Sequence, residues 1–96
     1  MRTLYIVTYD VSDDRRWRKV FKIMRGHGDH LQYSVFRCEL SDRERIGLME
    51  RLTRVIKHDA DQVLLFPLGP AGGVDDGRVQ AIGLPYPAPR TGAIIV

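Results

Sequence analysis

The 96-residue sequence has a single cysteine and no apolar run long enough to cross a membrane. Because Cys38 has no partner, an internal disulfide framework and a four-cysteine zinc site are both excluded, as is typical of a reducing cytoplasm. The longest apolar runs are a handful of residues, whereas a membrane-spanning helix needs about 20. The chain also starts directly with a strand-like segment and without the layout of a signal peptide. We therefore expect a cytoplasmic protein that has no membrane segment.

The stretch from Arg15 to Arg25 contains six basic residues and no acidic residue. The chain has 15 basic and 12 acidic residues, a net charge of +3, and twelve of the basic residues are arginines. On a helix, cations without acidic partners three or four residues away repel one another, and a guanidinium binds phosphate through two parallel hydrogen bonds. This stretch therefore favours a polyanionic partner over a merely solvated helix face. The residues that we assign to nucleic-acid binding are Arg15, Arg16, Arg18, Lys19 and Lys22.

Alternating and helical apolar patterns predict one α+β domain over residues 1–84, followed by an extension over residues 85–96. Strands are predicted at residues 4–9, 31–40, 63–68 and 79–82. We interpret the pattern as the ferredoxin-like βαββαβ arrangement, in which an antiparallel sheet carries both helices on one face.

Each predicted helix has a start signal and an apolar stripe. The first follows the polar residues 12–14, and Ser41 with Glu44 forms a capping box before the second. The stripe of the first helix consists of Trp17, Val20, Phe21 and Met24. The stripe of the second helix consists of Ile46, Met49, Leu52 and Ile56, with Leu48 and Val55 beside it.

The predicted sheet is apolar on both faces, although two helices cover only one. Residues 4–9 and 63–68 place apolar side chains on alternate sides of their strands. An exposed apolar face of this size normally marks an interface, so we expect a homodimer that packs sheet face against sheet face. After three prolines, residues 93–96 form a short β-branched run suited to strand addition, which predicts a C-terminal strand exchanged between the subunits. The alternative is a tail that folds back on its own sheet edge.

Asp10, at the end of the first strand, is the candidate metal ligand and catalytic residue. A turn aspartate that bonds its own backbone is the competing interpretation. Mg²⁺ needs only one or two protein carboxylates in addition to water and phosphate. A twofold axis near the end of this strand would bring two copies of Asp10 together around one ion.

Two other groups of residues are candidate ligand sites. His27 and His30 have the spacing of a metal-binding pair, but they lie in a glycine turn without a clear third ligand, so we interpret them as a turn. The aromatic residues Tyr5, Tyr9, Tyr33 and Phe36 could stack on bases, although packing in the core or an interface is the favoured use.

Two segments together resemble a known family. Tyr9-Asp10-Val11 precedes an acidic and then basic helix, and Leu31-Gln32-Tyr33-Ser34-Val35-Phe36 is followed by Cys38. These residues are similar to the Cas2 family of CRISPR-associated proteins, which belongs to the spacer-acquisition machinery. The resemblance implies a ferredoxin-like homodimer that partners an integrase subunit and holds duplex DNA. It also implies Mg²⁺-dependent endonuclease activity on RNA, including single-stranded RNA, or on DNA, with the metal on Asp10.

Three functional hypotheses remain open. In the first, the protein is a metal-dependent phosphodiesterase with Asp10 as ligand and arginines that stabilise phosphate charge. In the second, it is a noncatalytic dimeric bridge between integrase subunits, and the same arginines hold the duplex backbone. In the third, it is a toxin-like ribonuclease of the same fold that acts without an integrase.

Overall fold

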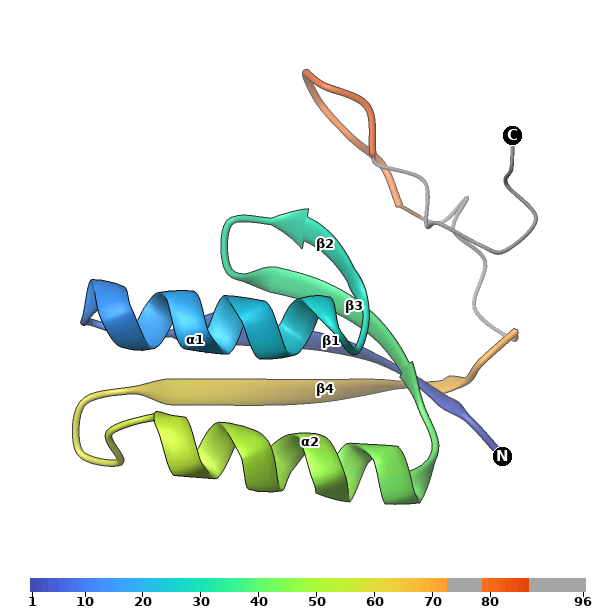
Figure 1. The fold of residues 1–96 in the computed structure, drawn as a ribbon. Coiled ribbons are helices and arrows are strands. Elements are labelled where there is room, and N and C mark those ends of the chain that lie inside the picture. The colour runs from blue at the N-terminus through green and yellow to red at the C-terminus, as the bar shows by residue number, and fades with distance from the viewer. Residues whose placement is uncertain (73–78, 87–96) are drawn as a thin grey trace.

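The computed structural model describes residues 1–72 and 79–86, and it consists of one antiparallel sheet with two helices (Figure 1). The strand order across the sheet is β2-β3-β1-β4, and every neighbouring pair is antiparallel. This is the predicted ferredoxin-like βαββαβ fold. The elements are β1 (Thr3–Asp10), α1 (Asp14–Arg25), β2 (Asp29–Gln32), β3 (Val35–Leu40), α2 (Asp42–Val55) and β4 (Gln62–Pro70).

Two of the four predicted strands were wrong in detail. Residues 31–40 are not one strand but a hairpin that turns at Tyr33 and Ser34. Residues 79–82 form no strand; Val79 and Ile82 are exposed, and these residues pair with no strand of the described sheet. The two errors cancel in the number of strands, and the edges of the described sheet are β2 and β4. The predicted exchanged strand at residues 93–96 lies outside the described residues.

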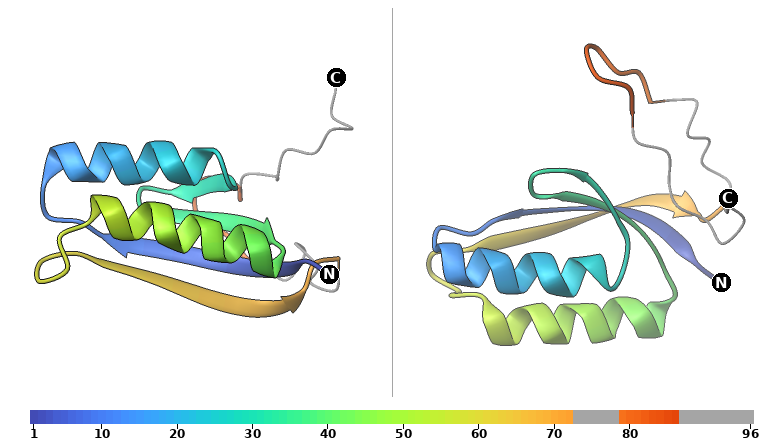
Figure 2. Two further views of the ribbon diagram at one scale, coloured as in Figure 1. Left: turned by 60° about the horizontal axis from the view of Figure 1, so that its bottom comes forward. Right: turned by 45° about the horizontal axis from the view of Figure 1, so that its top comes forward.

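Both helices cover the same face of the sheet (Figure 2). Asp13 caps α1, since its Oδ2 accepts a hydrogen bond from the Arg16 backbone N–H at 3.0 Å. The predicted capping box of α2 is confirmed: Ser41 Oγ accepts from the Glu44 N–H at 3.1 Å, and Glu44 Oε1 accepts from the Ser41 N–H at 2.8 Å. These caps satisfy backbone donors that would otherwise lack partners at the helix ends.

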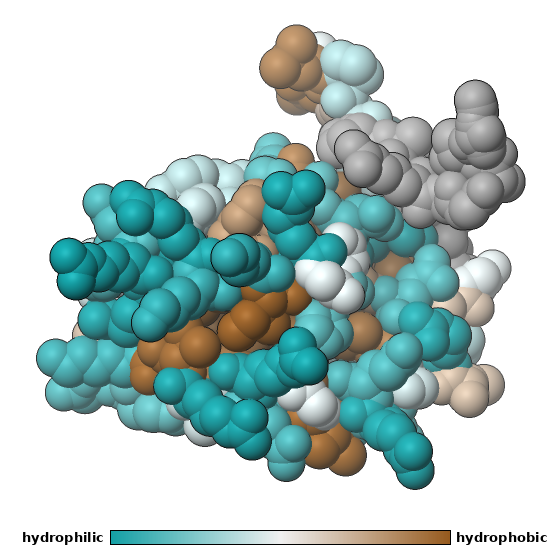
Figure 3. All heavy atoms as spheres, in the orientation of Figure 1, coloured by the Kyte–Doolittle hydropathy of each residue, from teal (hydrophilic) through white to brown (hydrophobic). Residues whose placement is uncertain are grey.

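The hydrophobic core lies between this sheet face and the helices. Val20 and Met24 of α1 are fully buried, as predicted, and Trp17 and Phe21 pack at its margin. The predicted stripe of α2 was partly wrong. Its buried residues are Leu48 and Leu52, whereas Ile46 and Met49 are exposed. Viewed from the helix side, the surface is mainly hydrophilic, with hydrophobic side chains in the gaps (Figure 3).

Among residues 1–72 and 79–86, no helix covers the opposite face of the sheet, and the apolar side chains of β4 on that face are exposed. Phe66 is 47% exposed, and Leu64 and Leu68 are exposed to a similar degree. On β1, the neighbour of β4, Ile6 pairs with Phe66 and Thr8 with Leu64. We call this surface, formed by Ile6, Leu64, Phe66 and Leu68, the open face.

Candidate functional site

Asp10 is the last residue of β1, and strand geometry places it on the side of the open face. Alternate residues of a strand point to opposite faces, so Ile6, Thr8 and Asp10 share one side while Tyr9 faces the helices. Asp10 is exposed and pairs with Gln62 at the start of β4. Its carboxylate forms no hydrogen bond or ion pair with residues 1–72 or 79–86. It is therefore accessible to a ligand from solvent or from a second subunit.

The donor chemistry at Asp10 suits one part of a Mg²⁺ site. A carboxylate is the hard oxygen ligand that this ion prefers, and the ion commonly retains several waters. Among the described residues, no group of three or more histidine, cysteine, aspartate or glutamate side chains is placed to hold a metal ion. Asp10 of one subunit can thus contribute a single ligand, and further ligands have to come from outside that subunit.

The loop that follows Asp10 is fixed by a buried carboxylate, Asp61. The side chain of Asp61 is fully buried, and Arg16 donates to it from Nε at 2.7 Å and from Nη2 at 3.2 Å. Backbone N–H groups of Ser12 and Lys57 donate to it at 3.2 and 2.9 Å. Hydrogen bonds from Arg16 and from the two backbone groups hold the pKa of Asp61 well below its usual range. Asp61 therefore joins the segment after β1 to the segment before β4.

The role of Asp61, which directly precedes the strand that pairs with the end of β1, is not predicted by the sequence. Asp61 lies 45 residues from Arg16 and 49 from Ser12, so no local motif indicates the contact.

The basic residues of α1 divide into two groups. Arg16 lies on one side of the helix and is engaged with Asp61. At 3.6 residues per turn the other cations share an arc of about 120° on a different side. We call this exposed set the α1 cation face, and it consists of Arg15, Arg18, Lys19, Lys22 and Arg25.

Two groups with reactive potential near the core are held in their neutral forms. Burial raises the pKa of Tyr9 to about 12, and its hydroxyl has no hydrogen-bond partner among the described residues. Burial also raises the pKa of the Cys38 thiol to about 12. A general base or a thiolate nucleophile has to lose its proton near neutral pH. Neither side chain meets that requirement.

His27 and His30 both have structural contacts, but the turn interpretation is correct only for His27, because His30 lies on β2. The His27 ring lies with Nδ1 2.8 Å from the carbonyl oxygen of Ile23, at the end of α1. The His30 ring contacts the rings of Phe21 and Phe36, with centroids 5.0 and 4.9 Å apart.

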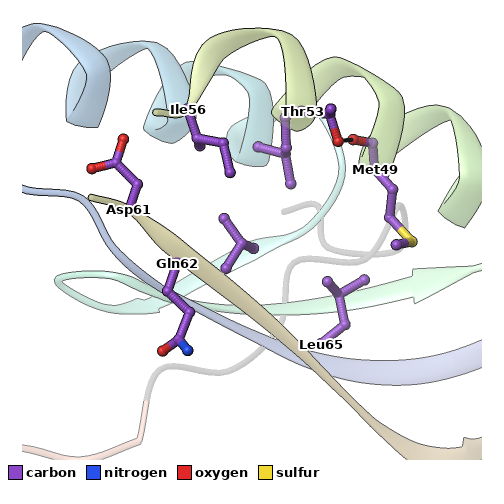
Figure 4. A pocket seen from close by; sticks show the side chains of 8 residues that line it. Met49, Thr53, Ile56, Asp61, Gln62 and Leu65 are labelled. Atoms are coloured by element: carbon purple, nitrogen blue, oxygen red, sulfur yellow. Dashed lines mark hydrogen bonds between the residues drawn. The ribbon is translucent and has the colours of Figure 1, made fainter. Parts of the chain in front are cut away.

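A cavity of about 270 Å³ lies between α2 and β4 and is lined mainly by apolar side chains, including Met49, Ile56 and Leu65 (Figure 4). Asp61 also borders this cavity, but its carboxylate is already occupied by Arg16, Ser12 and Lys57. The cavity therefore lacks an available charged group for phosphate chemistry.

Neither helix in the described residues has the length and apolar character of a membrane span.

The family model and the similar proteins all point to the same family. Residues 1–72 match the family described as CRISPR associated protein Cas2. The chain is 45% identical over 97 residues to a CRISPR-associated endoribonuclease Cas2 of Geobacter sulfurreducens, with all of both chains covered. It is 40% identical over 92 residues to a CRISPR-associated endoribonuclease Cas2 of Rhodospirillum rubrum, covering 96% of this chain and 89% of that one.

Solved structures agree with this result. The crystal structure of Streptococcus pyogenes Cas2 at pH 6.5 has a TM-score of 0.72 and 30% identity, covering 83% of this chain and 99% of that one. A hypothetical protein of Thermus thermophilus has a TM-score of 0.77 and 29% identity, covering 94% and 100%. The matched sequence, the shared fold and the relatives together place this chain in the CRISPR-associated Cas2 family.

Proposed function

We propose that this chain acts as a homodimer in CRISPR spacer acquisition, where it holds nucleic-acid backbone and bridges integrase subunits. We further propose that paired copies of Asp10 support Mg²⁺-dependent cleavage of a phosphodiester. The observation that carries both proposals is that Asp10 shares one side of the sheet with the partly exposed Ile6 and the exposed Leu64 and Phe66. If two copies bury this side against each other, the two carboxylates lie in the same interface.

The residues of the chain would have distinct roles in such a dimer. Asp10 from each subunit would hold the Mg²⁺ ion, which when bound lowers the pKa of a coordinated water and neutralises phosphate charge. The α1 cation face would bind phosphates through charge-assisted hydrogen bonds that are independent of base sequence. The Asp61 contacts would keep the loop after Asp10 in one conformation.

The name endoribonuclease, which the Geobacter sulfurreducens and Rhodospirillum rubrum relatives carry, supports a cleavage activity here. The noncatalytic bridge needs the same dimer and the same cations, so the role of Asp10 is what separates the two. The toxin-like ribonuclease without an integrase partner is the remaining alternative.

Asp10→Asn tests the assignment, because it removes the charge at nearly constant shape. Asp14→Asn is the matched control, since Asp14 is also exposed and lies on the neighbouring first turn of α1. We expect Asp10→Asn to lower the rate of Mg²⁺-dependent cleavage by more than about 100-fold. Mutation of a residue that only orients a metal ligand already lowers metal affinity or activity by about 10- to 100-fold, and Asp10 is proposed as the ligand itself.

The same variants should be assayed for insertion of short DNA into a repeat array by the complex with the integrase subunit. Unchanged insertion with lost cleavage assigns the two activities to separate parts of the protein. Cleavage that survives Asp10→Asn overturns the catalytic role, and a wild-type chain that neither binds nor stimulates the integrase overturns the bridging role in favour of the free ribonuclease.

A further inference from the structure

Tyr33 is the most exposed aromatic residue in the described parts of the chain, ahead of Phe66 on the open face. Of the four aromatic residues considered above for base stacking, Tyr5, Tyr9 and Phe36 are buried, whereas Tyr33 is 73% exposed. Tyr33 lies at the turn of the β2–β3 hairpin. Packing in the core is thus correct for the other three but not for Tyr33, for which packing in an interface stays a prediction. A large ring left in solvent points to another use.

The exposed ring of Tyr33 is held in place from beneath. It stacks on Trp17 of α1, with ring centroids 4.7 Å apart and an interplanar angle of 20°. Trp17 in turn donates from Nε1 to Ser34 Oγ at 2.9 Å, and the Ser34 carbonyl accepts from the Tyr9 N–H at 3.1 Å. The hairpin turn is therefore attached both to α1 and to the end of β1. A ring held in this way loses little conformational entropy when a ligand stacks on it.

The stack continues toward the basic residues of α1. Trp17 stacks on Phe21, with centroids 5.2 Å apart at 15°, and the guanidinium carbon of Arg25 lies 5.8 Å from the centre of the Phe21 ring. By helical periodicity, Arg18 and Arg25 are the cations of the α1 cation face nearest to this aromatic row. An aromatic platform beside a row of cations is the combination that single-stranded nucleic acids require.

We propose that Tyr33 and Trp17 form a stacking platform for an unpaired nucleobase, in a strand whose phosphates lie along the α1 cation face. This proposal rests on the proposed nucleic-acid binding and adds the substrate class at this position: a single-stranded segment. Bases inside a duplex are already stacked on each other, whereas unpaired bases can be splayed onto an aromatic ring. The platform is also at the same end of the sheet as Asp10, because the Tyr9 N–H contacts the hairpin turn.

Two oligonucleotides separate stacking from backbone binding: a single strand of about 12 nucleotides and a strand of equal length with abasic sites at every position. Both present the same phosphates, but only the first offers bases. We expect wild-type protein to bind the normal strand at least about fivefold more tightly, since stacking of one base on an aromatic side chain typically contributes this much or more. Saturating normal strand should also change the fluorescence of Trp17, which is the sole tryptophan.

Two variants at Tyr33 provide the matched comparison. Tyr33→Phe keeps the aromatic face, while Tyr33→Leu keeps an apolar cover over Trp17 without that face. We expect the preference for the normal strand to survive in Tyr33→Phe and to disappear in Tyr33→Leu, with unchanged affinity for the abasic strand and for duplex DNA. Thermal melting of each variant checks that it is folded.

The outcomes distinguish this platform from the function it rests on. Equal wild-type affinities for normal and abasic strands overturn the platform but leave backbone binding intact, and this comparison needs no variant. A preference that persists in Tyr33→Leu also overturns it. If wild-type protein binds none of the three probes, the proposed nucleic-acid function fails and the platform with it.

Discussion

Arg16 donates two hydrogen bonds to the buried carboxylate of Asp61, at 2.7 and 3.2 Å, across 45 residues of sequence. This pair joins the first turn of α1 to the connection before β4. Because Arg16 Nε and Nη2 already donate to Asp61, these two donors are not available to bind a phosphate. Of the basic residues predicted to bind nucleic acid, Arg16 is thus better suited to fixing the loop after Asp10 than to holding phosphate.

The Asp61 contacts predict a specific loss of stability in acid. The pKa of Asp61 is lower in the folded chain than its unfolded value of about 3.9, so the unfolded state takes up the proton more readily. This contribution to stability is fully present above the unfolded pKa and disappears as pH falls through the folded pKa. Melting curves recorded between pH 7 and pH 2 should show a fall in Tm of wild-type protein that starts below about pH 4.

Asp61→Asn isolates this effect from that of the other carboxylates. At pH 7 we expect its Tm to fall by at least about 5 °C, because Arg16 loses its buried charged partner. The difference in Tm between wild type and variant should then shrink as the pH is lowered. A difference that stays constant from pH 7 to pH 2 would contradict the assignment.

Local patterns predict the elements of this fold better than they predict its contacts. The strand at β1, the buried side of α1 and the capping box of α2 each depend on residues close in sequence, and all are confirmed. The break at Tyr33 and Ser34 has no glycine or proline to signal it, and the turn is held by Tyr9 and Trp17 from elsewhere in the chain.

At the candidate site too, residues in local patterns were predicted, whereas residues that depend on long-range contacts were not. Asp10 could be identified because it ends an obvious strand and because it belongs to a recognisable segment. The role of Asp61 depends on long-range contacts, and the exposure of Tyr33 depends on the hairpin that the sequence pattern hid. The stripe of α2 was misplaced because Ile46 and Met49 fit a helical period as well as Leu48 does, and only the packing decides between them.

Two glycines make a matched pair for a stability test. A Cβ at Gly28 would overlap the Arg37 carbonyl oxygen and Cys38 Sγ, whereas a Cβ at Gly47 in α2 would meet nothing within 4 Å. Overpacking costs about 1–3 kcal/mol, and alanine is favoured over glycine inside a helix by up to about 1 kcal/mol. Denaturant unfolding should therefore show Gly28→Ala destabilised and Gly47→Ala stabilised. Equal effects of the two substitutions would show that the end of α1 has room that the structure lacks.

The open face predicts a dimer that a single charge can break. Phe66→Glu places a carboxylate in the proposed interface once from each subunit, where it loses water and faces an apolar surface. We expect the dissociation constant to rise at least about 100-fold, since charges that oppose an interface cost several kcal/mol. Light scattering after size-exclusion chromatography measures the mass directly.

Ile46→Glu is the control for Phe66→Glu, because Ile46 is about equally exposed but lies on α2, away from the open face. It should leave the dimer intact. A wild-type chain that remains a monomer at several hundred micromolar, or a dimer that tolerates Phe66→Glu, would remove the basis for pairing two copies of Asp10.

The α1 cation face predicts how duplex binding depends on salt. Each phosphate contact releases counterions and adds about 0.9 to the slope of log affinity against log salt concentration. Arg18→Gln should lower the magnitude of that slope by about this amount and weaken all duplex sequences alike, because contacts to the backbone do not read bases. Arg51→Gln, which removes an exposed arginine of α2, is the control of equal charge change and should leave the slope unaltered. Arg16→Gln should lower Tm more than either of these, since it leaves the Asp61 carboxylate buried without its cation. Equal slopes for wild type and Arg18→Gln, measured by fluorescence anisotropy between 50 and about 300 mM salt, would place the nucleic acid on another surface of the protein.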